Sequence, residues 1–318
     1  LIQYCIFDKL NFETQIRFRQ ICKRLNRIDI HNLYYNVYTK YLKKLSDDIL
    51  VNYPKVKYLN ASFNPKITNI NHMTNLQILN ASKNCGIDDN GIKNLNLIEL
   101  YARDTEKITN VNHMTNLQIL NAYGLCCGID DNGIKDLNLI ELNASWNEKI
   151  TNIKHMTNLQ ILNASHNSRI DDNNIKDINL IELNANYNEK IKNVNHMTNL
   201  QILHASGDYC GIDDNDIKDL NLIELDASGN PKITNINHMT NLQILDATFN
   251  SGINDNGIKD LNLIELSASF NPKIKNINHM TNLKILHACW DCGIDNNGIK
   301  DLNLIKLNAE NNYKITKK

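Results

Sequence analysis

The phrase NHMTNLQILNAS, from Asn71 to Ser82, decides the fold because the chain repeats it with small changes along most of its length. Its core HMTNL occurs six times, and the histidine of that core stands at positions 72, 113, 155, 196, 238 and 279. The intervals between these histidines are 41 or 42 residues. A constant period of this length indicates a repeat architecture, in which each unit packs on its two neighbours.

Each period contains two related halves, one built on NLQIL and the other on NLIEL. Their strand phrases follow one another every 20 to 22 residues and define thirteen units, which start at residues 55, 75, 96, 116, 138, 158, 179, 199, 221, 241, 262, 282 and 303. The shared pattern is L-x-x-L-x-A-x-x-N-x-x-I, as in Leu139, Leu142, Ala144, Asn147 and Ile150. The alternation of Leu142 and Ala144 predicts a short strand with one buried face.

A polar residue, usually Asn, follows each strand phrase. A side-chain amide in this place can both donate to and accept from backbone groups of adjacent turns. We expect Asn in this slot in nine units, with Thr105 and Asp291 as polar substitutes; the nine are residues 64, 84, 147, 167, 188, 230, 250, 271 and 312.

The return segments differ between the two halves. IDDNGIKNL, from Ile87 to Leu95, has an Asp N-cap and apolar Ile92 and Leu95, which predicts a short helix. ITNINHMTNL, residues 67–76, has apolar residues three apart, which suits a 3₁₀ or short helical return. The histidines of this segment have identical neighbours in every copy, so we expect them on the solvated surface rather than in a catalytic site.

These phrases resemble the leucine-rich repeat, specifically its cysteine-containing subclass, whose N/C-x-x-I-T-D and G-I-x-x-L phrases are matched from about residue 52 to 318. The resemblance implies an α/β solenoid of about thirteen repeats, with a parallel sheet on the concave face and short helices or 3₁₀ turns on the convex face. Ala stands where the family usually has Leu, so we expect a thin core on the sheet side. We assign residues 47–318 to this repeat domain.

Residues 1–46 have a different pattern, with apolar side chains at helical spacing, which predicts a small helical domain. IFDKLNFETQIRFRQICKRLNRI resembles an F-box, in which Ile6, Phe7 and Leu10 match the first helix and the ICKRL phrase matches V-C-K-R-W. Leu25 replaces the usual Trp, and the Leu-Pro opening of the family would precede Leu1. A chain without an initial Met is expected to lack its true N-terminus. The resemblance assigns the adaptor contacts to Ile6, Phe7, Leu10, Ile16, Phe18, Ile21, Cys22 and Leu25.

F-box proteins with leucine-rich repeats are substrate receptors of SCF-type cullin–RING ubiquitin ligases. The resemblance therefore implies a non-catalytic subunit without a cofactor, whose F-box docks on the Skp-family adaptor while the repeats hold a protein substrate. The Asn-, Ile- and Lys-rich repeats are also similar to F-box proteins of giant amoeba-infecting, mimivirus-like viruses. A cytoplasmic or nuclear location is expected, in the host cytoplasm for a viral protein. The alternative is a repeat scaffold whose N-terminal helices only cap the solenoid.

Composition narrows the range of partners. The formal net charge is −1, so no general attraction to nucleic acid or anionic membrane is indicated, and no apolar run reaches the ~18 residues of a membrane-spanning helix. The eight cysteines lack paired spacing and are expected to be free thiols. His287, Cys289 and Cys292 form H-x-C-x-x-C, but without a fourth ligand they predict no metal site. Lys306 on the terminal edge strand favours a monomer.

Comparison of the copies shows where a partner could be recognised. Residues 141, 143 and 145 and their equivalents are expected on the concave side. The first of these columns alternates Ile and Glu, and the second is mostly Asn but includes Tyr101, His204, Asp226, Asp246 and His287. The most varied column precedes the Asn slot and consists of Phe63, Lys83, Asp104, Trp146, His166, Tyr187, Phe249, Phe270 and Trp290.

Aromatic side chains are concentrated in that last column, although they are only 6% of the chain. Exposed aromatic side chains at a strand edge are favoured binding anchors. We predict a substrate-binding surface formed by Tyr101, Trp146, Tyr187, Phe249, Phe270 and Trp290. The alternative is that these rings only pack against neighbouring loops.

Overall fold

The computed structural model of the chain describes residues 32–33 and 45–316. The chain divides into two compact units, Leu1–Asn158 and Leu159–Lys318. The eight predicted adaptor contacts, from Ile6 to Leu25, lie outside the described residues. The predicted boundary between a helical domain and the repeats at residue 46 stays a prediction.

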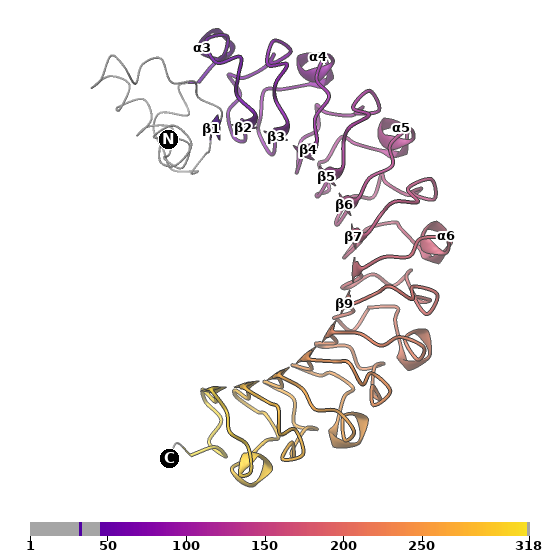
Figure 1. Cartoon of the computed structure of the whole chain (residues 1–318), viewed down its shortest axis with the longest axis vertical. Coiled ribbons are helices and arrows are strands. Elements are labelled where there is room, and N and C mark those ends of the chain that lie inside the picture. The colour runs from indigo at the N-terminus through magenta and orange to yellow at the C-terminus, as the bar shows by residue number, and fades with distance from the viewer. Residues whose placement is uncertain (1–31, 34–44, 317–318) are drawn as a thin grey trace, which may run out of the picture. The chain divides into compact units, whose positions relative to one another are not determined.

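The first unit is a row of short parallel strands with helices in the connections. Its described elements are β1 (Asn32–Leu33), α3 (Asp47–Leu50), β2 (Tyr58–Asn60), β3 (Ile78–Asn80), α4 (Asp89–Ile92), β4 (Glu99–Tyr101), β5 (Ile119–Asn121), α5 (Asp131–Ile134) and β6 (Glu141–Asn143). Each strand from β1 to β6 pairs in parallel with the next one in the sequence. The strands lie along one side of the unit, and α4 and α5 lie on the opposite side (Figure 1).

The second unit continues the same pattern. Its described elements are β7 (Ile161–Asn163), α6 (Asp172–Ile175), β8 (Glu182–Asn184), β9 (Ile202–His204), the 3₁₀ helix η4 (Asp214–Asp216), β10 (Glu224–Asp226), β11 (Ile244–Asp246), η5 (Asp255–Gly257), β12 (Glu265–Ser267), β13 (Ile285–His287), η6 (Asn297–Ile299) and β14 (Lys306–Asn308). Strands β7 to β14 pair in parallel, each with the next. Among the described residues, β2 to β14 place one strand in each of the thirteen predicted units, which confirms the predicted solenoid.

The core of each repeat lies between the strand and the return segment. In the copy around β6, Leu142 and Ala144 are fully buried, as are Ile150 and Met156 of the following return. The alanine is fully buried in every repeat from Ala61 to Ala288. In a single repeat, these apolar side chains would be exposed to water. Stacking on both neighbouring repeats removes this exposure.

The two return segments are built differently. The predicted helix is present in the IDDNGIKNL half, where the Asp88 carboxylate accepts a hydrogen bond from the Gly91 amide at 2.9 Å. The other half forms two consecutive turns instead of the predicted 3₁₀ or helical return. In the first copy Met73 N donates to Ile70 O and Leu76 N donates to Met73 O, both at 2.9 Å. Bonds spaced three residues apart close separate turns, whereas a helix needs them at successive residues.

The polar slot after the strand holds different residues in the two halves. In one half it holds a buried Asn, and Asn188 Nδ2 donates to Ala164 O at 2.7 Å and to Ile170 O at 3.2 Å. The predicted assignment of Asn84, Asn167, Asn250 and Asp291 to this slot is wrong, because all four are exposed. The buried places in those repeats belong to the following residues, Cys85, Ser168, Ser251 and Cys292. Thr105 is buried in the slot as predicted.

The repeated histidines lie at the surface of the return segments and contact the neighbouring half-repeat. His155 Nε2 is 3.1 Å from Ile134 O, the last residue of α5, and equivalent bonds recur at His113, His196, His238 and His279. Ile134 O also accepts a hydrogen bond from Leu137 N at 3.0 Å, so the imidazole is a second partner of this carbonyl and links two half-repeats. The constant HMTNL phrase is therefore part of the scaffold.

Candidate binding surface

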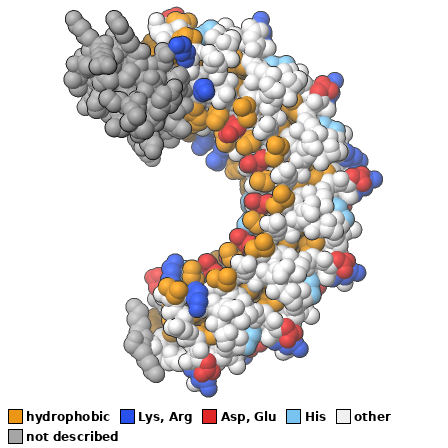
Figure 2. Space-filling view, viewed as in Figure 1, with side chains coloured by type: hydrophobic (Ala, Val, Ile, Leu, Met, Phe, Trp, Pro, Cys, Tyr) orange, Lys and Arg blue, Asp and Glu red, His pale blue; other side chains and the backbone are white. Residues whose placement is uncertain are grey.

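The strand side of each unit is apolar with acidic side chains between the apolar ones (Figure 2). Strands β3 to β13 each expose their first and third residues partly and bury the middle one. The prediction that residue 145 also faces this side is wrong, because Ser145 is buried and donates from its Oγ to Asn143 Oδ1 at 2.9 Å. Ser62, Ser82, Ser165, Ser206 and Cys289 are buried at the equivalent place.

The variable column before the polar slot has an unusual backbone conformation. Ten of its members have φ between +50° and +60°, namely Phe63, Lys83, Asp104, Trp146, His166, Tyr187, Phe249, Phe270, Trp290 and Asn311. Gly124, Gly207 and Gly229 hold the equivalent places in the remaining repeats, also at positive φ. We call these thirteen positions the left-handed column. A left-handed conformation costs a non-glycine residue about 1 kcal/mol, and bulky side chains seldom adopt it.

Neighbouring rings of this column stack on one another in the second unit. Phe249 and Phe270 have ring centroids 5.4 Å apart at an interplanar angle of 8°, and Phe270 and Trp290 are 5.5 Å apart at 13°. We call these three residues the ring stack. His166 and Tyr187 form a separate pair at 5.1 Å and 7°. These rings thus contact one another, while Phe249, Phe270, Trp290 and Tyr187 remain 56%, 38%, 48% and 47% exposed.

The column is less uniform in the first unit. Lys83 Nζ lies 4.9 Å from the centroid of the Phe63 ring, and, next to the column, the Arg103 guanidinium lies 4.2 Å from the centroid of the Tyr123 ring. Trp146 is half-buried. Tyr101 lies apart from the column, on β4, where its hydroxyl donates to Glu99 Oε2 at 3.2 Å. Burial, with the adjacent Glu99 carboxylate, raises the pKa of Tyr101 to about 12, so its hydroxyl stays protonated at neutral pH.

A row of titratable side chains crosses the strand side of the second unit. His204, Asp226 and Asp246 occupy paired positions on β9, β10 and β11. His204 Nδ1 is 3.8 Å from Asp226 Oδ2. The nearby carboxylate raises the pKa of His204, while burial raises the pKa of Asp246. Burial acts against ionisation of Asp226 as well, but the nearby His204 imidazole and hydrogen bonding from Ser228 outweigh it and lower its pKa.

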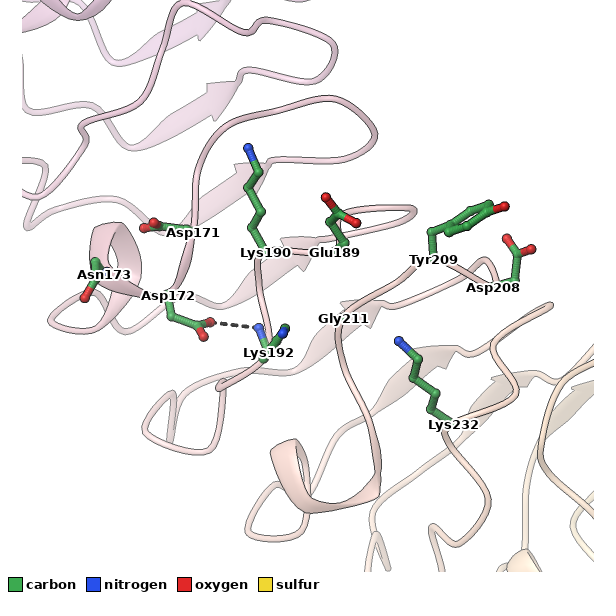
Figure 3. A pocket seen from close by; sticks show the side chains of 10 residues that line it. All are labelled: Asp171, Asp172, Asn173, Glu189, Lys190, Lys192, Asp208, Tyr209, Gly211 and Lys232. Carbon is green, nitrogen blue, oxygen red and sulfur yellow. Dashed lines mark hydrogen bonds between the residues drawn. The ribbon is translucent and has the colours of Figure 1, made fainter.

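An open pocket of about 650 Å³ lies beside α6 in the second unit (Figure 3). Its lining includes Asp171, Asp172, Lys192, Tyr209 and Lys232. These charged groups mostly serve the backbone: Asp171 caps α6, Asp172 Oδ1 accepts from Lys192 N at 2.8 Å, and Lys232 Nζ donates to Cys210 O at 2.8 Å. The lining contains no His, Cys or Ser.

Five of the six cysteines within the described residues are buried among the repeats, and Cys126 is exposed. The six within the described residues are free thiols, and burial raises the pKa of Cys85, Cys127 and Cys210 to about 11. Thiols with so high a pKa are poor nucleophiles at neutral pH. Cys292 of the H-x-C-x-x-C phrase is fully buried in a polar slot. Residues 32–33 and 45–316 contain no cluster of three or more His, Cys, Asp or Glu side chains arranged to hold a metal ion.

Within the same residues, no helix has the length and apolar character needed to cross a membrane.

The structure thus brings together part of the predicted surface. Phe249, Phe270 and Trp290 form one stack and Tyr187 forms a pair with His166, while Tyr101 lies apart from the column on β4. The sequence reasoning missed the two glycines of the second unit's column, Gly207 and Gly229. Gly207 and Gly229 occupy the same place in their repeats as Tyr187 and Phe249 do in theirs. Alignment of the repeats could therefore have identified them.

No protein-family model and no curated protein matches this sequence. Solved structures match it by fold. TLR13, in a complex with ssRNA13, aligns with a TM-score of 0.56 and 19% identity over 80% of this chain. The match covers 43% of the length of TLR13. An internalin, inlF, from Listeria monocytogenes aligns with a TM-score of 0.51 and 18% identity over 96% of this chain and 91% of its own.

A leucine-rich-repeat protein from Leptospira interrogans also matches, with a TM-score of 0.34 and 14% identity over 85% of this chain and 94% of its own. The repeated sequence phrases, the parallel strands and the fold match to TLR13 and inlF agree. Both units of the chain therefore have the leucine-rich-repeat fold.

Proposed function

We propose that this chain is the substrate-recognition subunit of an SCF-type cullin–RING ubiquitin ligase. In this proposal residues 1–46 dock on the Skp-family adaptor, and the strand side with the left-handed column binds a protein substrate. The chain performs no chemistry, holds no cofactor and acts as a monomer in the cytoplasm or nucleus. The adaptor part of the proposal rests on the F-box resemblance of residues 6–25.

The substrate-binding part is supported by one observation above all. Aromatic side chains occupy positions where the backbone conformation favours glycine, and they leave much of each ring in water. Strain of this kind persists where the residue has a use that outweighs its cost to stability. Large rings that are rigid and half-exposed bury much apolar area against a partner with little loss of side-chain entropy.

The adaptor part is tested by co-purification of the full chain with a purified Skp-family adaptor. We expect a one-to-one complex, and we expect Leu10→Glu combined with Ile21→Glu to abolish it while the circular dichroism spectrum of the repeats is unchanged. Deletion of residues 1–46 supplies the second control. If the folded full chain does not bind the adaptor, the ligase role is lost and the repeat-scaffold alternative remains.

A further inference from the structure

The left-handed column of the second unit contains a gap at Gly229. Gly207 and Gly229 are consecutive members of the column, with φ +94° and +61°. The Tyr187 ring covers Gly207, because a Cβ added at Gly207 would lie 2.5 Å from two atoms of that ring. A Cβ added at Gly229 would meet nothing closer than the Gly207 backbone at 3.9 Å. The column therefore leaves side-chain space open at Gly229.

Phe249 is the next member of the left-handed column after Gly229, so the register of the column places one face of its ring toward this gap. Its other face stacks on Phe270, and Phe249 is the most exposed member of the ring stack, at 56%. Neighbouring stacked rings of this unit lie 5.1 to 5.5 Å apart, which is one step along the solenoid. The absent side chain at Gly229 thus leaves room for one planar group on the open face of Phe249.

The surroundings of the gap are acidic. Strands β8 to β12 carry five carboxylates and no Lys or Arg; the acidic residues are Glu182, Glu224, Asp226, Asp246 and Glu265. His204, which contacts Asp226, and His287, which lies two strands from Asp246, are the cationic candidates in this row.

Two of these carboxylates accept hydrogen bonds from the backbone beside Gly229 and Phe249. Asp226 Oδ1 accepts from the amide of Ser228, the residue before Gly229, at 2.9 Å. Asp246 Oδ1 accepts from the amide of Thr248, the residue before Phe249, also at 2.9 Å. Burial raises the pKa of Asp246, and the neighbouring charge of Asp226 adds to that rise, so an incoming cation would stabilise the ionised pair.

We propose that the Gly229 gap receives an arginine side chain of the partner protein, whose guanidinium stacks on Phe249 and pairs with the carboxylates of Asp226 and Asp246. This inference rests on the binding surface proposed above and specifies the chemistry of its partner. Arginine fits because its cation is planar: it stacks on an aromatic face and presents several donors to carboxylates. A lysine ammonium is not planar, and a neutral aromatic ring would leave the carboxylates without a counter-charge.

Three short peptides test the chemistry on the full chain. The probes are Ac-Gly-Arg-Gly-NH₂, its citrulline equivalent, which is planar but neutral, and Ac-Gly-Phe-Gly-NH₂. Each is titrated while the NMR signals of the Gly229 amide and the Phe249 ring are followed. We expect saturable shifts with the arginine peptide and at least about 5-fold weaker binding of the citrulline peptide, because the cation contributes both the π and the carboxylate interactions.

A matched pair of variants tests the place. Gly229→Tyr fills the gap with a side chain that Tyr187 already carries at the same φ, so the backbone accommodates it. Asn311→Tyr adds the same ring at φ +58° in the last repeat and leaves the gap open. We expect Gly229→Tyr to lower the affinity for the arginine peptide about 10-fold or more, because the added ring covers the stacking face of Phe249. We expect Asn311→Tyr to leave that affinity unchanged.

The inference is overturned if the citrulline or phenylalanine peptide binds as well as the arginine peptide, if no peptide gives a saturable shift, or if Gly229→Tyr binds like the wild type. Such a result leaves the wider binding surface as a separate proposal, which is tested by removing the three rings of the stack together. Unchanged partner capture by that ring-free variant would instead refute the binding surface itself.

Discussion

At the scale of single residues, constancy and variation between the repeats have different causes. Constant residues connect the stacked backbone: the slot Asn188 donates to two carbonyl groups, and His155 contacts the Ile134 carbonyl of the preceding half-repeat. The sequence predicted this role of the slot Asn but placed it wrongly in four repeats, where Cys85 or its equivalent is buried instead. Positive φ in the variable column could not be predicted, because aromatic residues carry no preference for it.

Asn271→Ala tests the structural role of the slot. Asn271 Nδ2 donates to Ala247 O at 2.8 Å and Ile253 O at 3.2 Å, and its Oδ1 accepts from Lys273 N at 2.9 Å. Removal leaves these buried groups without partners, and we expect a loss of about 2–3 kcal/mol in unfolding free energy, measured by urea denaturation. Asn250→Ala, at an exposed Asn, is the control and should change little. Equal effects of the two substitutions would contradict the assignment.

Phe270→Gly and Phe270→Ala separate backbone strain from stacking. Both variants lose the ring contacts with Phe249 and Trp290, but only glycine adopts φ +58° without steric cost. We expect the glycine variant to be more stable than the alanine variant by about 1 kcal/mol in urea denaturation. An alanine variant that is as stable as the glycine variant would show that position 270 carries no strain.

The pH dependence of stability tests the His204–Asp226 contact. The pKa of His204 is raised in the folded chain, so its stabilising contribution is complete below the ordinary value of 6.5 and is lost as the pH rises through the raised pKa. The pKa of Asp226 is lowered in the folded chain. The stabilisation from the His204–Asp226 contact is therefore also lost as the pH falls through the lowered pKa of Asp226. We expect His204→Asn to cost about 0.5 kcal/mol at pH 5.5 and less at pH 8.5, in urea denaturation at each pH. A cost that grows with pH would contradict this sign.

At the scale of elements, the strands were predictable and the connections only in part. The period-two alternation placed all thirteen repeat strands, and the Asp N-cap placed the short helices. The spacing of three in ITNINHMTNL fits both a 3₁₀ helix and successive turns, because both close bonds between residues three apart. The helices also hold the next half-repeat, a contact between segments about twenty residues apart that local spacing does not reveal.

Asp131 of α5 makes such a contact. Its Oδ1 accepts from Thr151 N at 2.7 Å and Asn152 N at 2.9 Å, and its Oδ2 accepts from Thr151 Oγ1 at 2.6 Å. We expect Asp131→Ala to lower the unfolding free energy by about 1–2 kcal/mol, because two backbone donors lose a charged acceptor. Asp136→Ala, beyond the end of α5, is the matched control and should retain wild-type stability in urea. If the two variants unfold at the same urea concentration, Asp131 does not hold the repeats together.

At the scale of the whole molecule, the scaffold and the proposed function draw on different residues. The stacking phrases that dominate the sequence predicted the fold, and the same uniformity leaves few positions that distinguish one partner from another. Those positions are concentrated in the left-handed column, whose ring stack arises from residues 20 or 21 apart. The sequence predicted each of these rings as an anchor, but their mutual stacking and the gap at Gly229 required the three-dimensional register.

The most direct measurement compares the proteins that full-length wild type and a ring-free variant label in proximity labelling in cells. The variant is Phe249→Gly, Phe270→Gly and Trp290→Gly together, which removes the ring stack while glycine keeps the left-handed backbone without strain. Tyr313→Ala, an exposed tyrosine outside the left-handed column, is the control. The account predicts that a defined set of proteins labelled by the wild type and by Tyr313→Ala is lost from the folded ring-free variant. Identical sets for all three proteins would contradict it.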